Sequence, residues 1–196
     1  MMQAIANDLA LHSWAKCDYF LDETTCDQLI AEIHSLRAAN LMRPAGVGRG
    51  KDYALASSIR SDAIHWLDEA ALSPAQTLAC GKLNDLRQTL NRELFLGLRE
   101  LEVHLTHYGP SGHYDKHVDN FQGQSSRILS CVVYLNKGWT IDDGGLLRIF
   151  APDDDSLLIA EVEPRLGTLA CFLSREVPHE VSTTTKDRLS LTGWFR

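Results

Sequence analysis

A short stretch near the middle of the chain, GHYDKHVDN, carries two histidines and two aspartates and contains the pattern His-x-Asp twice. The two pairs are His113 with Asp115 and His117 with Asp119. In a β-strand, residues i and i+2 point to the same face, so an imidazole and a carboxylate at this spacing can bind one metal ion. One such triplet is weak support by itself, because a chain with eight histidines contains about one by chance. The stretch predicts a metal site to which either pair could contribute.

A third ligand should come from a different strand. The candidate is His179 in REVPHEVS, which follows the apolar run LGTLACFL. Two imidazoles and one carboxylate on one face of an octahedral metal leave the opposite face open, as in non-heme Fe(II) oxygenases. A structural zinc site would instead close its shell with four protein ligands. The simpler alternative for His179 is a strand-end histidine bonded to a carbonyl.

A single arginine, Arg188, stands at the start of the last apolar run, LSLTGWF. An arginine that faces the interior of a small barrel is costly unless an anion pairs with it. The far carboxylate of a bound dicarboxylate could supply that anion through a bidentate contact with the guanidinium. The alternative is an ordinary strand-end arginine in water.

The elements that would position these residues change character near residue 100. Before it, apolar residues recur at helical spacing in DETTCDQLIAEIHSLRAAN and again from Ser73 to about Phe95. Ser73 followed by Pro74 is a typical helix start. Between the two predicted helices, RPAGVGRGKD predicts an exposed loop and SIRSDAIHWL a short strand.

From residue 101 the apolar period becomes two, in LEVHLTHY, ILSCVVYL, LLRIF, LLIAEVE, LGTLACFL and LSLTGWF. Turn signals such as GPSG, NKGW and DDGG separate these runs. Six short strands without helix-length gaps predict an antiparallel barrel or a double-sheet jelly roll. The whole is an α+β chain in which the helices cover one face of the β-core.

Composition excludes several classes of protein. The chain has 19 Lys and Arg against 26 Asp and Glu, a net charge of -7, so nucleic acid and anionic membranes are poor partners. No stretch approaches the ~20 apolar residues of a membrane-spanning helix, and the first residues, MMQAIANDLALHSW, lack a signal-peptide pattern. Five cysteines without a C-x-x-C pair argue against a disulfide framework. We expect a reduced, cytoplasmic protein.

Taken together, HYDKHVDN, RILSCVVYLNKGW, DGGLLRIF, VEPRLGTLACFLS and VPHEVSTTTKDRLSLTGWF resemble the 2-oxoglutarate and Fe(II)-dependent prolyl hydroxylases. The similarity is greatest to the hypoxia-inducible-factor prolyl hydroxylases and their bacterial relatives. AGVGRGKDY and SIRSDAIHWL resemble, more weakly, a substrate-covering loop and the strand after it. The resemblance implies one dioxygenase domain over residues 1–196, with a double-stranded β-helix (jelly-roll) core at 101–196. Residues 1–100 would be mainly helical support with a mobile loop near 45–53.

The resemblance also implies roles for individual residues. His117, Asp119 and His179 match the iron ligands, which selects the second His-x-Asp triplet. Arg188 and Tyr134 match the residues that bind the distal carboxylate of 2-oxoglutarate.

Further matches concern the rim and the walls of the pocket. His113 and Asp115 would lie at the rim. The remaining matches are Tyr108, Tyr114 and Leu147 for the pocket lining, and Arg127 and Trp194 for the region near the prolyl substrate. Plain core packing is the alternative for Tyr134, Leu147 and Trp194.

The activity that the resemblance implies is hydroxylation of a prolyl residue in a protein with an exposed prolyl loop. Fe(II), 2-oxoglutarate and dioxygen would be required, with ascorbate as an optional addition, and succinate and CO2 would be formed. Elongation factor Tu is the leading candidate substrate, oxygen sensing is an associated role, and we favour a monomer.

Two alternatives stay open. One is a dioxygenase of the same fold that acts on a small molecule or free amino acid. The other is a non-catalytic cupin-like module, which would leave Arg188 and Tyr134 without a role.

Overall fold

The computed structural model describes residues 1–46, 56, 58–120 and 126–196. In these described ranges, short 3-10 turns lie at η2 (Glu69–Ala71) and η4 (Ile141–Asp143). The helices are α1 (Met2–His12), α2 (Glu23–Ala38) and α3 (Pro74–Leu94). The strands are β1 (Trp14–Cys17), β2 (Arg43–Pro44), β3 (Ala63–Trp66), β4 (Leu101–Tyr108), β5 (Tyr114–His117), β6 (Leu129–Tyr134), β7 (Leu147–Phe150), β8 (Leu158–Val162), β9 (Leu169–Leu173), β10 (His179–Val181) and β11 (Arg188–Phe195).

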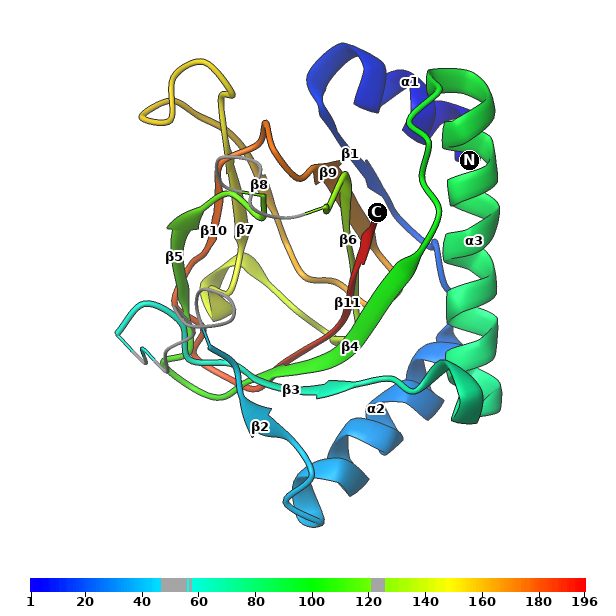
Figure 1. Cartoon of the computed structure of the whole chain (residues 1–196). Helices are drawn as coiled ribbons and strands as arrows, with labels where there is room; N and C mark the ends of the chain where they lie inside the picture. Colours follow the sequence, from blue (N-terminus) through cyan, green and yellow to red (C-terminus); the bar gives the residue numbers. More distant parts are fainter. Residues whose placement is uncertain (47–55, 57, 121–125) are drawn as a thin grey trace.

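The strands form two sheets that face each other. The larger sheet has the order β1-β9-β6-β11-β4-β3-β2, and the smaller has the order β5-β10-β7-β8. Every pairing within them is antiparallel. The three helices lie on the outer side of the larger sheet (Figure 1), where their apolar residues share one core cluster with it. This is a double-sheet jelly roll with helices on one face, so the predicted α+β fold is confirmed and the choice between barrel and jelly roll is resolved.

Both predicted helices form because each has a capped N-terminus and one apolar face. A capping box of Ser73 and Gln76 begins α3, and the side chain of Asp22 accepts a hydrogen bond from the Thr25 amide at the start of α2. The inward residues of α2 and α3 are almost completely buried: Cys26, Leu29 and Ile33, and Ala79, Leu83, Leu86 and Leu90. Helix α1 was not predicted, and it buries only Ile5, Ala6 and Leu9.

Each of the six predicted β-rich runs contains a strand, but the short polar strands were not predicted. β5 and β10 have four and three residues, too few to show a period of two. Of SIRSDAIHWL only the last part forms β3, and Arg60 makes a single bridge to Tyr114 instead. The predicted loop at 45–53 lies, beyond Gly46, outside the described residues.

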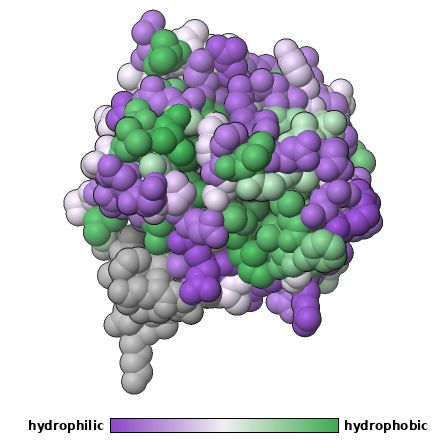
Figure 2. Space-filling view, turned by 90° about the horizontal axis from the view of Figure 1, so that it is seen from above, coloured by the Kyte–Doolittle hydropathy of each residue, from purple (hydrophilic) through white to green (hydrophobic). Residues whose placement is uncertain are grey.

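The surface carries apolar side chains in separate patches, with hydrophilic side chains between them on the face shown in Figure 2. Leu157, Leu158 and Ile159 at β8 are among the exposed apolar residues. No helix in the described part of the chain is both long and apolar enough to cross a membrane.

One histidine of β4 is buried in the fold. His104 is 1% exposed, and its Nδ1 is hydrogen-bonded to the Thr106 hydroxyl at 2.9 Å. Its ring contacts those of Trp66 and Trp194, at centroid distances of 4.8 and 5.3 Å. Burial lowers the pKa of His104 from 6.5 to about 4, so the folded state holds this imidazole neutral.

This burial predicts a pH-dependent stability. The unfolded chain protonates His104 below pH 6.5 and the folded chain only near 4, so stability falls as the pH falls through that window. The loss should reach about 3 kcal/mol at most. We expect His104→Gln to reduce the slope of the free energy of unfolding against pH, measured by urea denaturation. The same change at the exposed His12 should leave the slope as in the wild type. A wild-type slope in His104→Gln would contradict the assignment.

Candidate active site

The two candidate histidine ligands face each other across a strand pair of the smaller sheet. His117 ends β5 and His179 begins β10, and the two residues are direct partners in the antiparallel register. Asp119 follows β5 by two residues, in a turn. One ligand atom from each of these three residues lies within 4.8 Å of the others. The structure thus brings together the predicted metal set of two imidazoles and one carboxylate.

Backbone carbonyls orient both imidazoles in the same way. His117 Nδ1 donates to the carbonyl of Asp115 at 2.8 Å, and His179 Nδ1 donates to the carbonyl of Val177 at 3.0 Å. A carbonyl can only accept, so Nδ1 carries the proton and Nε2 keeps its lone pair in the neutral ring. A metal-ligating histidine is typically fixed by such a bond from its other nitrogen. Burial, followed by the charge of His117, lowers the pKa of His179 to about 4, which favours this neutral form.

The larger sheet holds the carboxylate. Asp119 Oδ2 accepts hydrogen bonds from the Ser130 hydroxyl at 2.6 Å and from the Trp194 indole N–H at 2.8 Å. Ser130 on β6 and Trp194 on β11 are cross-strand partners. Burial alone would raise the pKa of Asp119, but its contacts with His117, His179 and Ser130 outweigh burial and hold that pKa well below its usual range. Asp119 is therefore a charged carboxylate whose other oxygen, Oδ1, lies 3.6 Å from His117 Nε2.

A second layer of side chains packs behind the histidines. The Tyr114 ring stacks on His117 at 3.7 Å, and the Phe172 ring lies 4.3 Å from His179. The guanidinium of Arg60 lies 4.5 Å from the centre of the Tyr114 ring and is paired with the buried Asp62 at 2.6 Å. These contacts restrict the imidazoles to the orientation that faces Asp119.

The larger sheet also carries a buried cation at the start of β11. Arg188 is 2% exposed, and its Nε donates to the carbonyl of Gly145 at 2.7 Å. Its guanidinium carbon is 5.2 and 5.0 Å from the ring centres of Tyr108 and Tyr134. In the described part of the chain no carboxylate forms an ion pair with Arg188, and the buried hydroxyl of Tyr134 has no geometrically complete hydrogen bond. A buried charge and an orphaned hydroxyl side by side fit an anionic ligand group.

Tyr134 keeps its proton in this setting. Burial raises the pKa of Tyr134 to about 12, and the positive charge of Arg188 acts in the opposite direction. The phenol is therefore a neutral hydrogen-bond donor beside a fixed positive charge. That combination suits a carboxylate, which accepts from both groups.

The other residues predicted for the site lie in different places. His113 and Asp115 stay outside the metal group, and His113 Nε2 contacts the Ser58 carbonyl at 3.2 Å. Tyr108 and Leu147 are buried, and Leu147 shares a core cluster with Tyr134. The guanidinium of Arg127 covers the Trp194 ring at 3.5 Å, and its Nε donates to Glu102. The roles suggested for these residues stay predictions.

The residues of the site that the sequence did not reveal include Ser130, Gly145 and Arg60, together with Asp62, which pairs with Arg60. Ser130 is a single hydroxyl in an apolar strand, and Arg60 and Asp62 lie in a stretch with no clear period. None of these three residues stands in a sequence pattern that indicates a functional role. The double glycine of DDGG was a signal, but it indicated only a turn.

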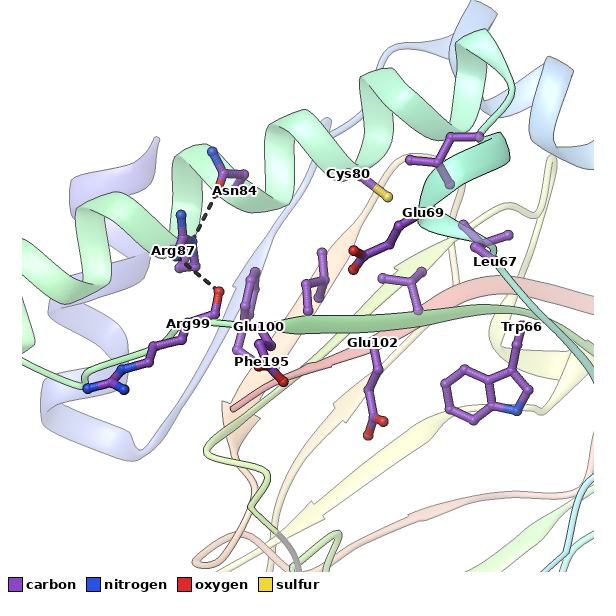
Figure 3. A pocket seen from close by; sticks show the side chains of 13 residues that line it. Trp66, Leu67, Glu69, Cys80, Asn84, Arg87, Arg99, Glu100, Glu102 and Phe195 are labelled. Carbon is purple, nitrogen blue, oxygen red and sulfur yellow. Dashed lines mark hydrogen bonds between the residues drawn. The ribbon is translucent and has the colours of Figure 1, made fainter.

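A separate pocket lies between α3 and β4 (Figure 3). Its volume is about 600 Å³, and its wall includes Trp66, Cys80, Arg87 and Glu102. The pocket lies next to Trp194 and Arg127. Its wall residue Trp66 is 6.2 Å from Trp194, and its wall residue Glu102 forms an ion pair with Arg127. None of the predicted site residues lines it.

Comparison with known proteins identifies the type of site. A family model described as the 2OG-Fe(II) oxygenase superfamily matches residues 103–196. A prolyl-4-hydroxylase structure from Pseudomonas putida is 39% identical, with a TM-score of 0.90, and the alignment covers 100% of this chain and 99% of that one. Human prolyl hydroxylase EGLN3 is 29% identical over 199 residues, which cover 94% of this chain and 80% of the human protein.

A prolyl hydroxylase from Trichoplax adhaerens, solved with a peptide fragment of the hypoxia-inducible-factor oxygen degradation domain, shares the fold. Its TM-score is 0.85 at 20% identity, and the alignment covers 99% of this chain and 88% of that one. The fold, the metal group and these similarities define an iron-dependent oxygenase that uses 2-oxoglutarate. The chain belongs to the 2OG-Fe(II) oxygenase superfamily. Within it, the protein is an oxygenase of the prolyl hydroxylase type.

Enzymes of this superfamily require Fe(II), 2-oxoglutarate and dioxygen, and the donor chemistry here fits that requirement. Two imidazole nitrogens and one carboxylate form the facial set that Fe(II) takes in such oxygenases. Arg188 and Tyr134 offer a buried charge and a hydroxyl to a dicarboxylate. The residues present thus fit both the metal and the cosubstrate.

The hydrogen bond from Trp194 to Asp119 predicts an effect on metal affinity. In Trp194→Phe the ring remains but the N–H is lost, so the carboxylate is less firmly oriented. We expect the dissociation constant for Mn(II), a redox-inert substitute for iron, to rise about tenfold in calorimetric titrations. The control is Trp66→Phe, which changes a neighbouring indole that has no bond to Asp119. Equal losses of affinity in the two variants would contradict the role of the N–H.

Proposed function

We propose that this protein hydroxylates a prolyl residue in an exposed loop of a protein substrate. The observation that carries the proposal is a His-Asp-His group together with a buried arginine that forms no ion pair with any described residue, in a chain 39% identical over its full length to a bacterial prolyl-4-hydroxylase. The Trichoplax relative, solved with a peptide, supports a polypeptide substrate. Elongation factor Tu is the substrate we would test first.

The side chains of the site would bind either the metal or the cosubstrate. Nε2 of His117, Nε2 of His179 and the carboxylate of Asp119 would hold Fe(II). When bound, the iron with 2-oxoglutarate and dioxygen supplies the oxidising chemistry that converts the cosubstrate to succinate and CO2 and hydroxylates the substrate. Arg188 and Tyr134 would bind the distal carboxylate of 2-oxoglutarate and so fix its orientation.

The walls of the pocket would control access. Tyr108, Tyr114 and Leu147 are half-buried or buried and would line the cosubstrate side, where they limit the entry of water. Arg127 and Trp194 would lie near the prolyl substrate. Because Trp194 also donates a hydrogen bond to Asp119, this one side chain would both contact the substrate and orient the metal ligand.

Removal of the charge at Arg188 should affect the cosubstrate and not the metal. The variant Arg188→Met keeps a long apolar side chain at this buried position but loses the guanidinium that would pair with 2-oxoglutarate. We expect the KM for 2-oxoglutarate to rise at least about thirtyfold, because truncating a buried charge pair costs roughly 2 kcal/mol or more. The affinity for Mn(II) should stay within about twofold of the wild type. Arg148→Met, which removes a half-exposed arginine paired with Glu161 and Glu180, is the control. An unchanged KM in Arg188→Met would refute the assignment.

The substrate class can be tested with isotopically heavy dioxygen. We would incubate the protein with Fe(II) and 2-oxoglutarate in lysate from its source organism, and separately with purified elongation factor Tu. Labelled residues would be mapped by mass spectrometry, with His179→Ala as the inactive control. The expected result is one heavy oxygen on one proline of one protein, absent with His179→Ala. Succinate without labelled protein would favour a small-molecule substrate, and neither product would favour a non-catalytic binding module.

A further inference from the structure

The DDGG turn before β7 is a conspicuous motif to which the proposed function gives no role. Gly144 and Gly145 have φ of +65° and +61°, in the left-handed region that favours glycine. Gly144 packs against the segment that precedes β11, where an added Cβ would lie 2.1 Å from the Thr183 carbonyl oxygen. The turn therefore packs closely against the segment that precedes Arg188.

Gly145 contacts Arg188 in two ways. Its carbonyl accepts the hydrogen bond from Arg188 Nε at 2.7 Å. A Cβ on Gly145 would lie 2.9 Å from Arg188 Cδ, and 3.2 Å from both Trp139 Cζ2 and Thr184 Cβ. The aliphatic part of the arginine therefore occupies the space that any side chain at position 145 would need.

The turn is held in place from its other side. The indole N–H of Trp139, a residue only 5% exposed, donates to the Gly144 carbonyl at 3.0 Å. Lys186 lies 5.1 Å from the centre of the Trp139 ring and is paired with Asp143 at 2.8 Å. The Gly145 carbonyl consequently has a fixed position from which to hold Arg188.

With Nε bonded to Gly145 and the rings of Tyr108 and Tyr134 near its guanidinium, the fork of Arg188 has one defined direction. Its terminal nitrogens are the groups left to meet a ligand. We propose that Gly145, fixed through the Trp139–Gly144 bond, is a positioning residue that aims Arg188 and thereby sets the affinity for the distal carboxylate of 2-oxoglutarate. The inference rests on the proposed function in that Arg188 is taken to bind this carboxylate.

The test compares Gly145→Ala with Gly97→Ala. Gly97 has φ of +67° and no atom within 4 Å of an added Cβ, so its variant carries the same backbone strain without the clash. Affinity would be measured by calorimetry, for 2-oxoglutarate with the Mn(II)-loaded protein and for glutarate with the metal-free protein. We expect Gly145→Ala to weaken both ligands about tenfold or more, because small misplacements of a binding group are costly. Gly97→Ala should change them less than about twofold, and Mn(II) affinity should be unchanged in both variants.

A double-mutant cycle with Arg188→Met separates positioning from a general structural effect. If Gly145 acts through Arg188, Gly145→Ala should add little to the loss of 2-oxoglutarate affinity already caused by Arg188→Met. Additive losses, lost Mn(II) affinity in Gly145→Ala, or wild-type ligand affinity in that variant would each overturn the inference. Wild-type affinity in Arg188→Met alone would instead show that the proposed role of Arg188 is wrong, and the positioning inference would fall with it.

Discussion

The pairing of His117 with His179 across β5 and β10 is the contact on which the site depends. Side chains alternate between the faces of a sheet, so a slip of one residue would turn one imidazole away from the other. The two strands are short, and an irregular register follows His179 immediately. Their alignment is maintained by β7 on the other side of β10, where His179 pairs with Ile149, a fully buried residue. The packing of the smaller sheet therefore fixes the separation of the two nitrogens.

Each sheet supplies a different part of the site. The smaller sheet provides the imidazoles, whereas the larger sheet holds Asp119 through Ser130 and Trp194 and carries Arg188 and Tyr134. The helices cover the outer face of the larger sheet (Figure 1) and share its main core. None of the three residues of the metal group lies on a helix, and the helices contribute to the site by packing against the sheet that holds its carboxylate. The chain carries a net charge of -7, and yet the guanidinium of Arg188 is buried, at 2% exposure.

Much of the fold could be predicted because local periodicity encodes it. The apolar stripes of α2 and α3 are buried, and so are most apolar residues of the predicted β-rich runs. The run at β8 is the exception, because Leu158 and Ile159 are exposed. The three metal candidates could be found because two of them stand in one motif and His179 follows the apolar run of a different strand, and the resemblance then selected the second His-x-Asp triplet. β5 and β10 were beyond prediction, since four and three residues are too few to show a period.

The sequence by itself determined the residue types of the site, namely two histidines, an aspartate, an arginine and a tyrosine, with the helices and main strands around them. Only the tertiary structure decided which atoms meet. The bond from Trp194 to Asp119 joins residues 75 positions apart, and that from Arg188 to Gly145 joins residues 43 apart. No local pattern specifies such contacts, because they form only when two sheets and a tight turn pack to one geometry.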